Sequence, residues 1–153
     1  MKFSEILDPG TLRIDAYDAE HFCISGQVFA HAVLLLPDAP VRPWVLPQSP
    51  SSSPPSRSMK QNTLEKADLE DFEPADIRDL ERADLEALLD ARPQVILIGT
   101  GATPILPPPS LLAAGAEDGI GIEWMRTGAA CRTYNLLASE GRRVAAGLLL
   151  ERP

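Results

Sequence analysis

Polar side chains with a spacing suited to chemistry gather near the C-terminal end of the chain. Thr127, Cys131 and Asn135 recur at four-residue intervals, so a helix would place them in one stripe, with Arg132 and Tyr134 beside it. The first N–H groups of a helix have no partner inside the helix and attract negative charge. The pattern therefore predicts a small site for an anionic ligand where this helix begins.

The turn Gly99-Thr100-Gly101 is the second candidate segment. It follows the apolar run 95–98, which has the pattern of a central parallel strand covered on both faces, and ligands of open α/β sheets bind at the carboxyl ends of such strands. The sequence GTGA is only a fragment of the dinucleotide fingerprint GxGxxG, because Pro104 stands where the third glycine belongs. We expect a ligand cleft between this turn and the start of the polar helix, and no cofactor.

Nucleophilic or metal chemistry finds little support in the residue types. Cys131 would need a base beside it, and the two histidines, His21 and His31, lie in a different part of the chain. The two cysteines, Cys23 and Cys131, lack the CxxC spacing of a zinc site. We therefore assign no catalytic residue and expect no metal.

A structural interpretation of the same residues stays open beside the ligand site. Thr127 is placed to cap a helix through its hydroxyl group, Tyr134 to pack in the core and Asn135 to bind a loop backbone. Cys131 would then be a buried small residue, and Arg132 would face solvent.

The elements around these residues follow from local signals. Proline in a first helical turn costs no hydrogen bond, and glycine ends helices. The expected order is a strand at 95–98, a helix at 110–116, a strand at 120–125, a helix at 128–140 and a strand at 143–150. Such an order predicts parallel strands joined by helical crossovers.

The N-terminal part has the patterns of β structure. Segments 12–17 and 22–24 predict a hairpin, 28–36 a long strand through the core and 41–46 a short strand. The Pro/Ser-rich segment 47–59 predicts a disordered loop or insertion, and the acidic stretch 60–92 a partly amphipathic helical region.

Length and charge bound the class of protein. A chain of 153 residues fits a single domain, 1–153, and its net charge of −8 argues against a nucleic-acid partner. The apolar runs are far shorter than the roughly 20 residues that span a bilayer, so we expect a soluble protein without a membrane span. The first residues lack the pattern of a targeting segment, which favours a cytoplasmic location.

The segment 95–150 resembles the family called domain of unknown function 498, and segment 12–46 does so more loosely. The residues that carry the resemblance are Gly99-Thr100-Gly101, Pro107-Pro108, Gly119-Ile120, Thr127, Ala130, Tyr134-Asn135, Leu137 and Gly141. The resemblance implies a three-layer α/β domain with a central mixed sheet whose last strand is antiparallel. The family includes an assembly factor of mitochondrial respiratory complex I, so the resemblance also implies a protein partner and no established enzymatic activity. The chain departs from the family at Arg126, where a small polar residue is common, and in the segment 47–59.

Two classes of function remain from the sequence. One is a non-catalytic binding or assembly protein, similar to a complex I assembly factor. The other is a protein or enzyme that binds a small anionic ligand in the predicted cleft.

Overall fold

Two β-sheets and three α-helices make up the described part of the chain. The computed structural model describes residues 11–46, 77 and 80–152. The predicted insertion 47–59, and the acidic stretch 60–92 up to residue 76, lie outside the described residues. The α/β class and the mixed sheet expected from the sequence are confirmed.

The larger sheet has five strands in the order β5-β4-β8-β6-β7. Its strands are β4 (Val33–Leu35), β5 (Arg42–Pro43), β6 (Val95–Gly99), β7 (Gly121–Met125) and β8 (Val144–Leu148). Strand β6 pairs with β7 and β8 in parallel, whereas β4 pairs with β8 and β5 in antiparallel fashion. The strand at 95–98 is therefore internal, but β8 rather than β6 occupies the middle of the sheet.

The orientation of the last strand corrects one expectation. The family resemblance implied an antiparallel last strand, yet β8 runs parallel to β6 and is antiparallel only to β4. The reason lies in the helix between β7 and β8, because a helical crossover returns the chain to the same end of the sheet and so produces a parallel strand.

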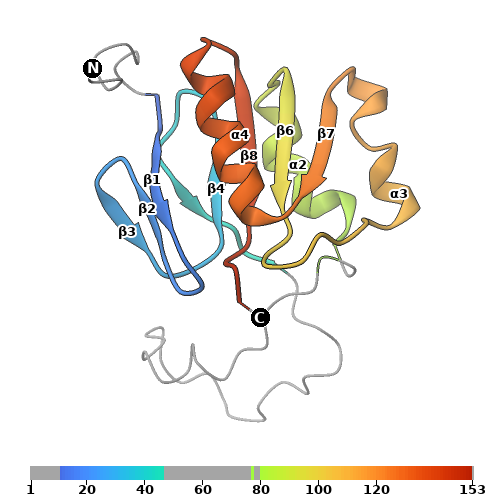
Figure 1. Ribbon diagram of the computed structural model, residues 1–153. Coiled ribbons are helices and arrows are strands. Elements are labelled where there is room, and N and C mark those ends of the chain that lie inside the picture. The colour runs from blue at the N-terminus through green and yellow to red at the C-terminus, as the bar shows by residue number, and fades with distance from the viewer. Residues whose placement is uncertain (1–10, 47–76, 78–79, 153) are drawn as a thin grey trace, which may run out of the picture.

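The helices and the smaller sheet form layers on the two faces of this sheet (Figure 1). One face carries α4 (Thr127–Ser139) and the three-stranded sheet of β1 (Ile14–Tyr17), β2 (Phe22–Ile24) and β3 (Gln27–Phe29). The opposite face carries α2 (Arg82–Asp90) and α3 (Pro109–Leu112), with the 3₁₀ turn η3 (Ala116–Asp118) after α3. Each face buries its own apolar cluster, so β6 and β8 are covered on both sides.

The predicted long strand 28–36 is wrong, because the chain changes sheets within it. Residues 27–29 form β3 and pair with β2, while residues 33–35 form β4 and pair with β8. Val28 on β3 is 67% exposed, whereas all three residues of β4 are buried. An apolar run does not reveal where a chain leaves one sheet for another, since Val28 and Phe29 of β3 are as apolar as the residues of β4.

The hairpin predicted for segments 12–17 and 22–24 is confirmed as β1 and β2. The turn between them is held by Asp18, whose carboxylate accepts hydrogen bonds from the N–H groups of Glu20 and His21. Ser25 and Gly26 have positive φ angles and form the next turn, between β2 and β3.

Candidate functional site

The two helical connections that follow β6 run in opposite directions along the sheet, and the predicted site lies where their direction changes. From β6 the chain passes through α3 to β7 on one side, and from β7 through α4 to β8 on the other. The carboxyl end of β6 is thus a point where the strand order reverses, the usual position of a ligand site in open α/β sheets. The turn Gly99-Thr100-Gly101 lies there, next to the first residues of α4.

Thr127, at the start of α4, packs against that turn. Its side chain is fully buried, and its hydroxyl group donates a 2.6 Å hydrogen bond to the carbonyl of Leu149. The same oxygen accepts a 2.9 Å hydrogen bond from the N–H group of Gly101. Thr127 therefore joins the end of β6 to the segment after β8.

The predicted role of Thr127 as a helix N-cap is wrong. Arg126 is the N-cap residue, and its side chain, which has no acceptor, makes no cap hydrogen bond. The hydroxyl group of Thr127 is bonded to Gly101 and Leu149 instead. Thr127 is the first residue of α4.

The glycine turn is packed closely against the start of α4. A Cβ atom at Gly99 would lie 2.8 Å from Thr127 Oγ1 and 3.0 Å from Thr127 Cα. Thr100 is buried, its N–H group donates to the carbonyl of Met125, and its hydroxyl group donates to the carbonyl of Thr103 at 2.7 Å. The polar groups of the turn are thus bonded within the chain.

Glu151 occupies the position that a bound anion would take at the start of α4. Its Oε1 atom accepts a 2.8 Å hydrogen bond from the N–H group of Gly128. A carboxylate at a helix N-terminus is stabilised both by that hydrogen bond and by the helix dipole. Glu151 is absent from the residues predicted for the site, although an acidic residue just beyond an apolar strand is a signal for it in the sequence.

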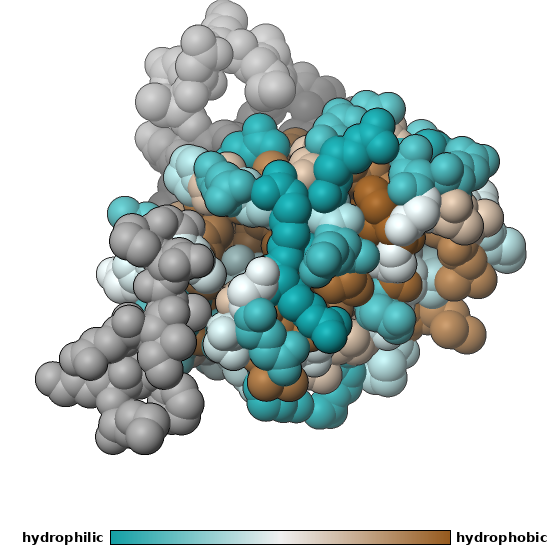
Figure 2. All heavy atoms as spheres, turned by 90° about the horizontal axis from the view of Figure 1, so that it is seen from above, coloured by the Kyte–Doolittle hydropathy of each residue, from teal (hydrophilic) through white to brown (hydrophobic). Residues whose placement is uncertain are grey.

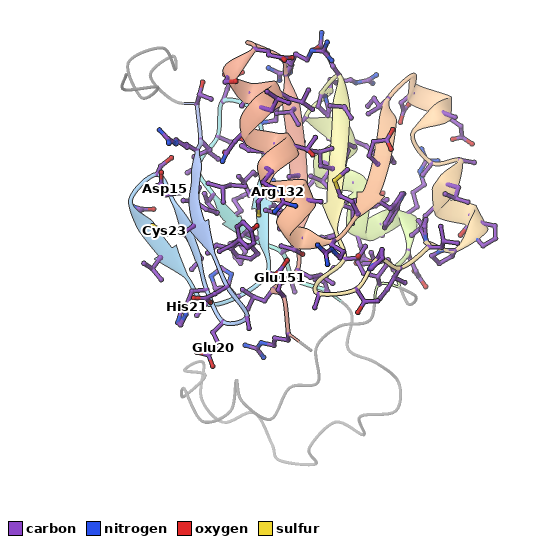
Figure 3. The ribbon with its side chains drawn as sticks, viewed as in Figure 1. Asp15, Glu20, His21, Cys23, Arg132 and Glu151 are labelled. Carbon is purple, nitrogen blue, oxygen red and sulfur yellow. The ribbon has the colours of Figure 1, made fainter. Side chains whose placement is uncertain are left out.

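Arg132 and Tyr17 complete the surroundings of Glu151. Arg132 Nη1 donates a 2.7 Å hydrogen bond to the phenolic oxygen of Tyr17 on β1. Tyr17 is also close to Gly128, because a Cβ atom at Gly128 would lie 3.0 Å from the Tyr17 oxygen. Figure 3 labels Arg132 on α4 and Glu151 in the segment that follows β8.

The thiol of Cys131 is buried and stays protonated at ordinary pH. Burial, together with the negative charge of Glu151, raises its pKa to about 12, and the positive charge of Arg132 opposes the shift. A thiolate is the reactive form, so this environment is the opposite of the one that activates a nucleophilic cysteine. Burial likewise raises the pKa of Tyr134 to about 12.

Asn135 binds the backbone of β1. Its side-chain oxygen accepts a 2.9 Å hydrogen bond from the N–H group of Ile14, and its nitrogen donates a 2.8 Å hydrogen bond to the carbonyl of the same residue. The amide thus satisfies both main-chain groups of Ile14 and attaches the small sheet to α4.

Of the predicted site residues, Thr127 lies against the glycine turn, whereas Asn135 lies two helical turns further along α4 and binds β1. The side-chain hydrogen bonds of Thr100, Thr127, Arg132 and Asn135 run to other groups of the chain itself. A depression of about 590 Å³ lies elsewhere, between α2 and the turn after β4. Among residues 11–46, 77 and 80–152, His, Cys, Asp and Glu form no group of three or more that could hold a metal ion.

Comparison with known proteins identifies the family. Residues 14–149, which include α4 and every strand of the described part, match the family described as protein of unknown function (DUF498/DUF598). The chain belongs to this family. The resemblance seen in the sequence is thereby confirmed.

Two solved structures show the same fold in relatives. A Xanthomonas campestris protein is 33% identical, with a TM-score of 0.64 over 94% of this chain and 87% of the other. A Bordetella parapertussis protein is 29% identical, with a TM-score of 0.68 over 93% of this chain and 98% of the other.

A third relative is the 13 kDa major membrane protein of Francisella tularensis, which is 40% identical over 60 residues. That match covers 39% of this chain and about half (49%) of the relative. In the described part of this DUF498/DUF598 chain, no helix is long and apolar enough to cross a membrane.

Proposed function

We propose that this protein is a non-catalytic binding domain that helps to assemble a larger protein complex. The observation that carries the proposal is the closed junction at the start of α4. Thr127, fully buried, bonds to Gly101 and Leu149, and Glu151 binds the N–H group of Gly128, so the residues best suited to chemistry hold the fold together.

The chemistry of the individual groups supports the same proposal. The raised pKa of Cys131 keeps its thiol neutral, and the side-chain amide of Asn135 is engaged with both main-chain groups of Ile14. The alternative is an anion-binding protein or enzyme that uses the same junction. It would require Glu151 to leave the start of α4 before a ligand could bind there.

The first test is to find a partner of the full chain and to measure the interaction with purified proteins. The tagged chain is expected to capture the same protein repeatedly from extracts of its own organism, and the purified pair is expected to form a complex of fixed stoichiometry in calorimetry. Complex I subunits are the first candidates, because of what the family resemblance implies.

A parallel measurement addresses the ligand alternative. The thermal midpoint of the purified chain is recorded with phosphate, nucleotides and organic acids, since a ligand at 100 times its Kd adds about 2.7 kcal/mol to stability. We expect no specific shift. A shift that Arg132→Ala abolishes, together with the lack of a reproducible partner, would contradict the proposed function.

A further inference from the structure

Strand β7 is an edge strand of the larger sheet. It pairs with β6 on one side, and among the described residues no strand pairs with its other side. An edge strand presents N–H and C=O groups to which an added strand can bind.

The ladder between β6 and β7 shows which groups point outward. The carbonyl of Met125 accepts a hydrogen bond from the N–H group of Thr100, so Met125 and Glu123, two residues earlier, direct their main-chain groups towards β6. Successive residues of a strand alternate, so Ile122 and Trp124 direct theirs to the outer edge. These two residues are the ones to which an added strand would bind.

Glu123 lies between them and is the one charged residue of β7. Its side chain is exposed, and within the described ranges it has no ion-pair partner. In an antiparallel ladder, two opposite residues that do not hydrogen-bond to each other lie close together, with Cα atoms about 4.5 Å apart. Glu123 would stand in such a pair, because its main-chain groups are directed towards β6. A basic side chain placed opposite Glu123 would therefore form an ion pair.

The same geometry disfavours a second copy of the chain as the occupant. The register that pairs all five residues of β7 with their copies would place Glu123 directly opposite Glu123 of the other molecule. Like charges in opposite positions of a sheet are destabilising.

The connection from β6 to β7 also exposes apolar side chains. Leu106 and Leu112, in the connection from β6 to β7, are 85% and 58% exposed. Figure 2 shows brown side chains gathered along the margin of the molecule on the side of α3 and β7.

We propose that the edge of β7 binds an extended segment of a partner protein, which adds antiparallel to β7 and places a lysine or arginine opposite Glu123 between apolar residues. This inference rests on the proposed function and names the surface and the partner chemistry that serve it. It is carried by the outward main-chain groups of Ile122 and Trp124 together with the exposed charge of Glu123.

The test uses two end-capped eight-residue peptides of alternating valine and threonine that differ only at one central position, lysine or glutamate. Binding to the full chain is measured by NMR titration. The lysine peptide is expected to bind the wild type about five times more tightly than the glutamate peptide, the upper range for one opposite-charge pair across two strands. Glu123→Lys should reverse the preference, whereas Glu20→Lys, an equal charge change at an exposed turn, should leave it unchanged.

Hydrogen exchange shows whether the main chain takes part. The amides of Ile122 and Trp124 are expected to exchange more slowly when the lysine peptide is bound. No binding to the wild type, equal binding of the two peptides, or unchanged exchange of both amides would overturn the edge proposal. Concentration-dependent self-association that protects these amides would overturn it in favour of a second copy.

The two proposals can fail separately. If a purified natural partner binds the wild type and Glu123→Lys equally well, the proposed function stands and the β7 edge is not the surface used. If no partner is found and an anion stabilises the chain, the proposed function itself fails.

Discussion

Glu151 accepts a 2.8 Å hydrogen bond from the main-chain N–H group of Gly128, the second residue of α4. The chain thus supplies its own anion at the helix start where the sequence predicts a bound ligand. The carboxylate also contributes to the high pKa of Cys131 one turn further along the helix.

Replacing Glu151 should separate the charge from the hydrogen bond. Glu151→Gln keeps an acceptor for Gly128 and removes the charge, so we expect a loss of about 0.3–1 kcal/mol in the free energy of unfolding. Glu151→Ala removes both and should cost about 1–2 kcal/mol. Urea denaturation measures the difference, and equal stability of all three proteins would show that the contact does not stabilise α4.

Thr127→Val should destabilise the fold although the two side chains have the same shape. The change leaves the carbonyl of Leu149 and the N–H group of Gly101 without a partner, and each buried unpaired group costs about 1–3 kcal/mol. Thr127→Ser keeps the hydroxyl group and should lose only about 1 kcal/mol for its methyl group. If serine were as damaging as valine in thermal denaturation, the hydrogen bonds would not be the cause.

Gly99→Ala should test how closely β6 approaches α4. The added methyl group would lie within 3.0 Å of the Cα atom of Thr127, which is main chain and cannot turn aside. We expect a loss of about 1–3 kcal/mol by overpacking. The control is Gly121→Ala on β7, where the added methyl group meets nothing within 4 Å, and calorimetric midpoints compare the two.

Asn135→Asp and Asn135→Ala should reveal how the small sheet is attached. Aspartate can accept from the N–H group of Ile14 but cannot donate to its carbonyl, whereas alanine does neither. Both changes should lower stability by about 1–3 kcal/mol and speed amide exchange in β1 before β6. Uniform exchange throughout the chain would contradict a local role for Asn135.

Stability should fall with rising pH above about 9. The pKa of Cys131 rises from 9.0 to about 12 on folding and that of Tyr134 from 10.0 to about 12, so the unfolded chain loses these protons first. The stabilisation is complete below pH 9 and is lost as the pH approaches 12. Denaturation at a series of pH values should show a weaker decline for Cys131→Ala, while Cys23→Ala should match the wild type.

Local signals were sufficient for the elements of the C-terminal half. Proline at the start of α3, glycine after α4 and the apolar runs of β6 and β8 act within a few residues, so the order of strands and helices could be predicted. The strand boundaries within 28–36 could not be predicted in this way. Val28 and Val33 belong to one apolar run but to strands of different sheets.

The sequence by itself determined the α/β class, the family resemblance and the position of Thr127, Cys131 and Asn135 on one helix. Only the tertiary structure decided what they do. Asn135 binds Ile14, and Arg132 binds Tyr17, although each pair is more than one hundred residues apart in the chain. Glu151 accepts a hydrogen bond from Gly128, and the rest of α4 and all of β8 lie between them in the sequence. Contacts of this kind depend on how the layers pack, and no local pattern of residue types encodes them.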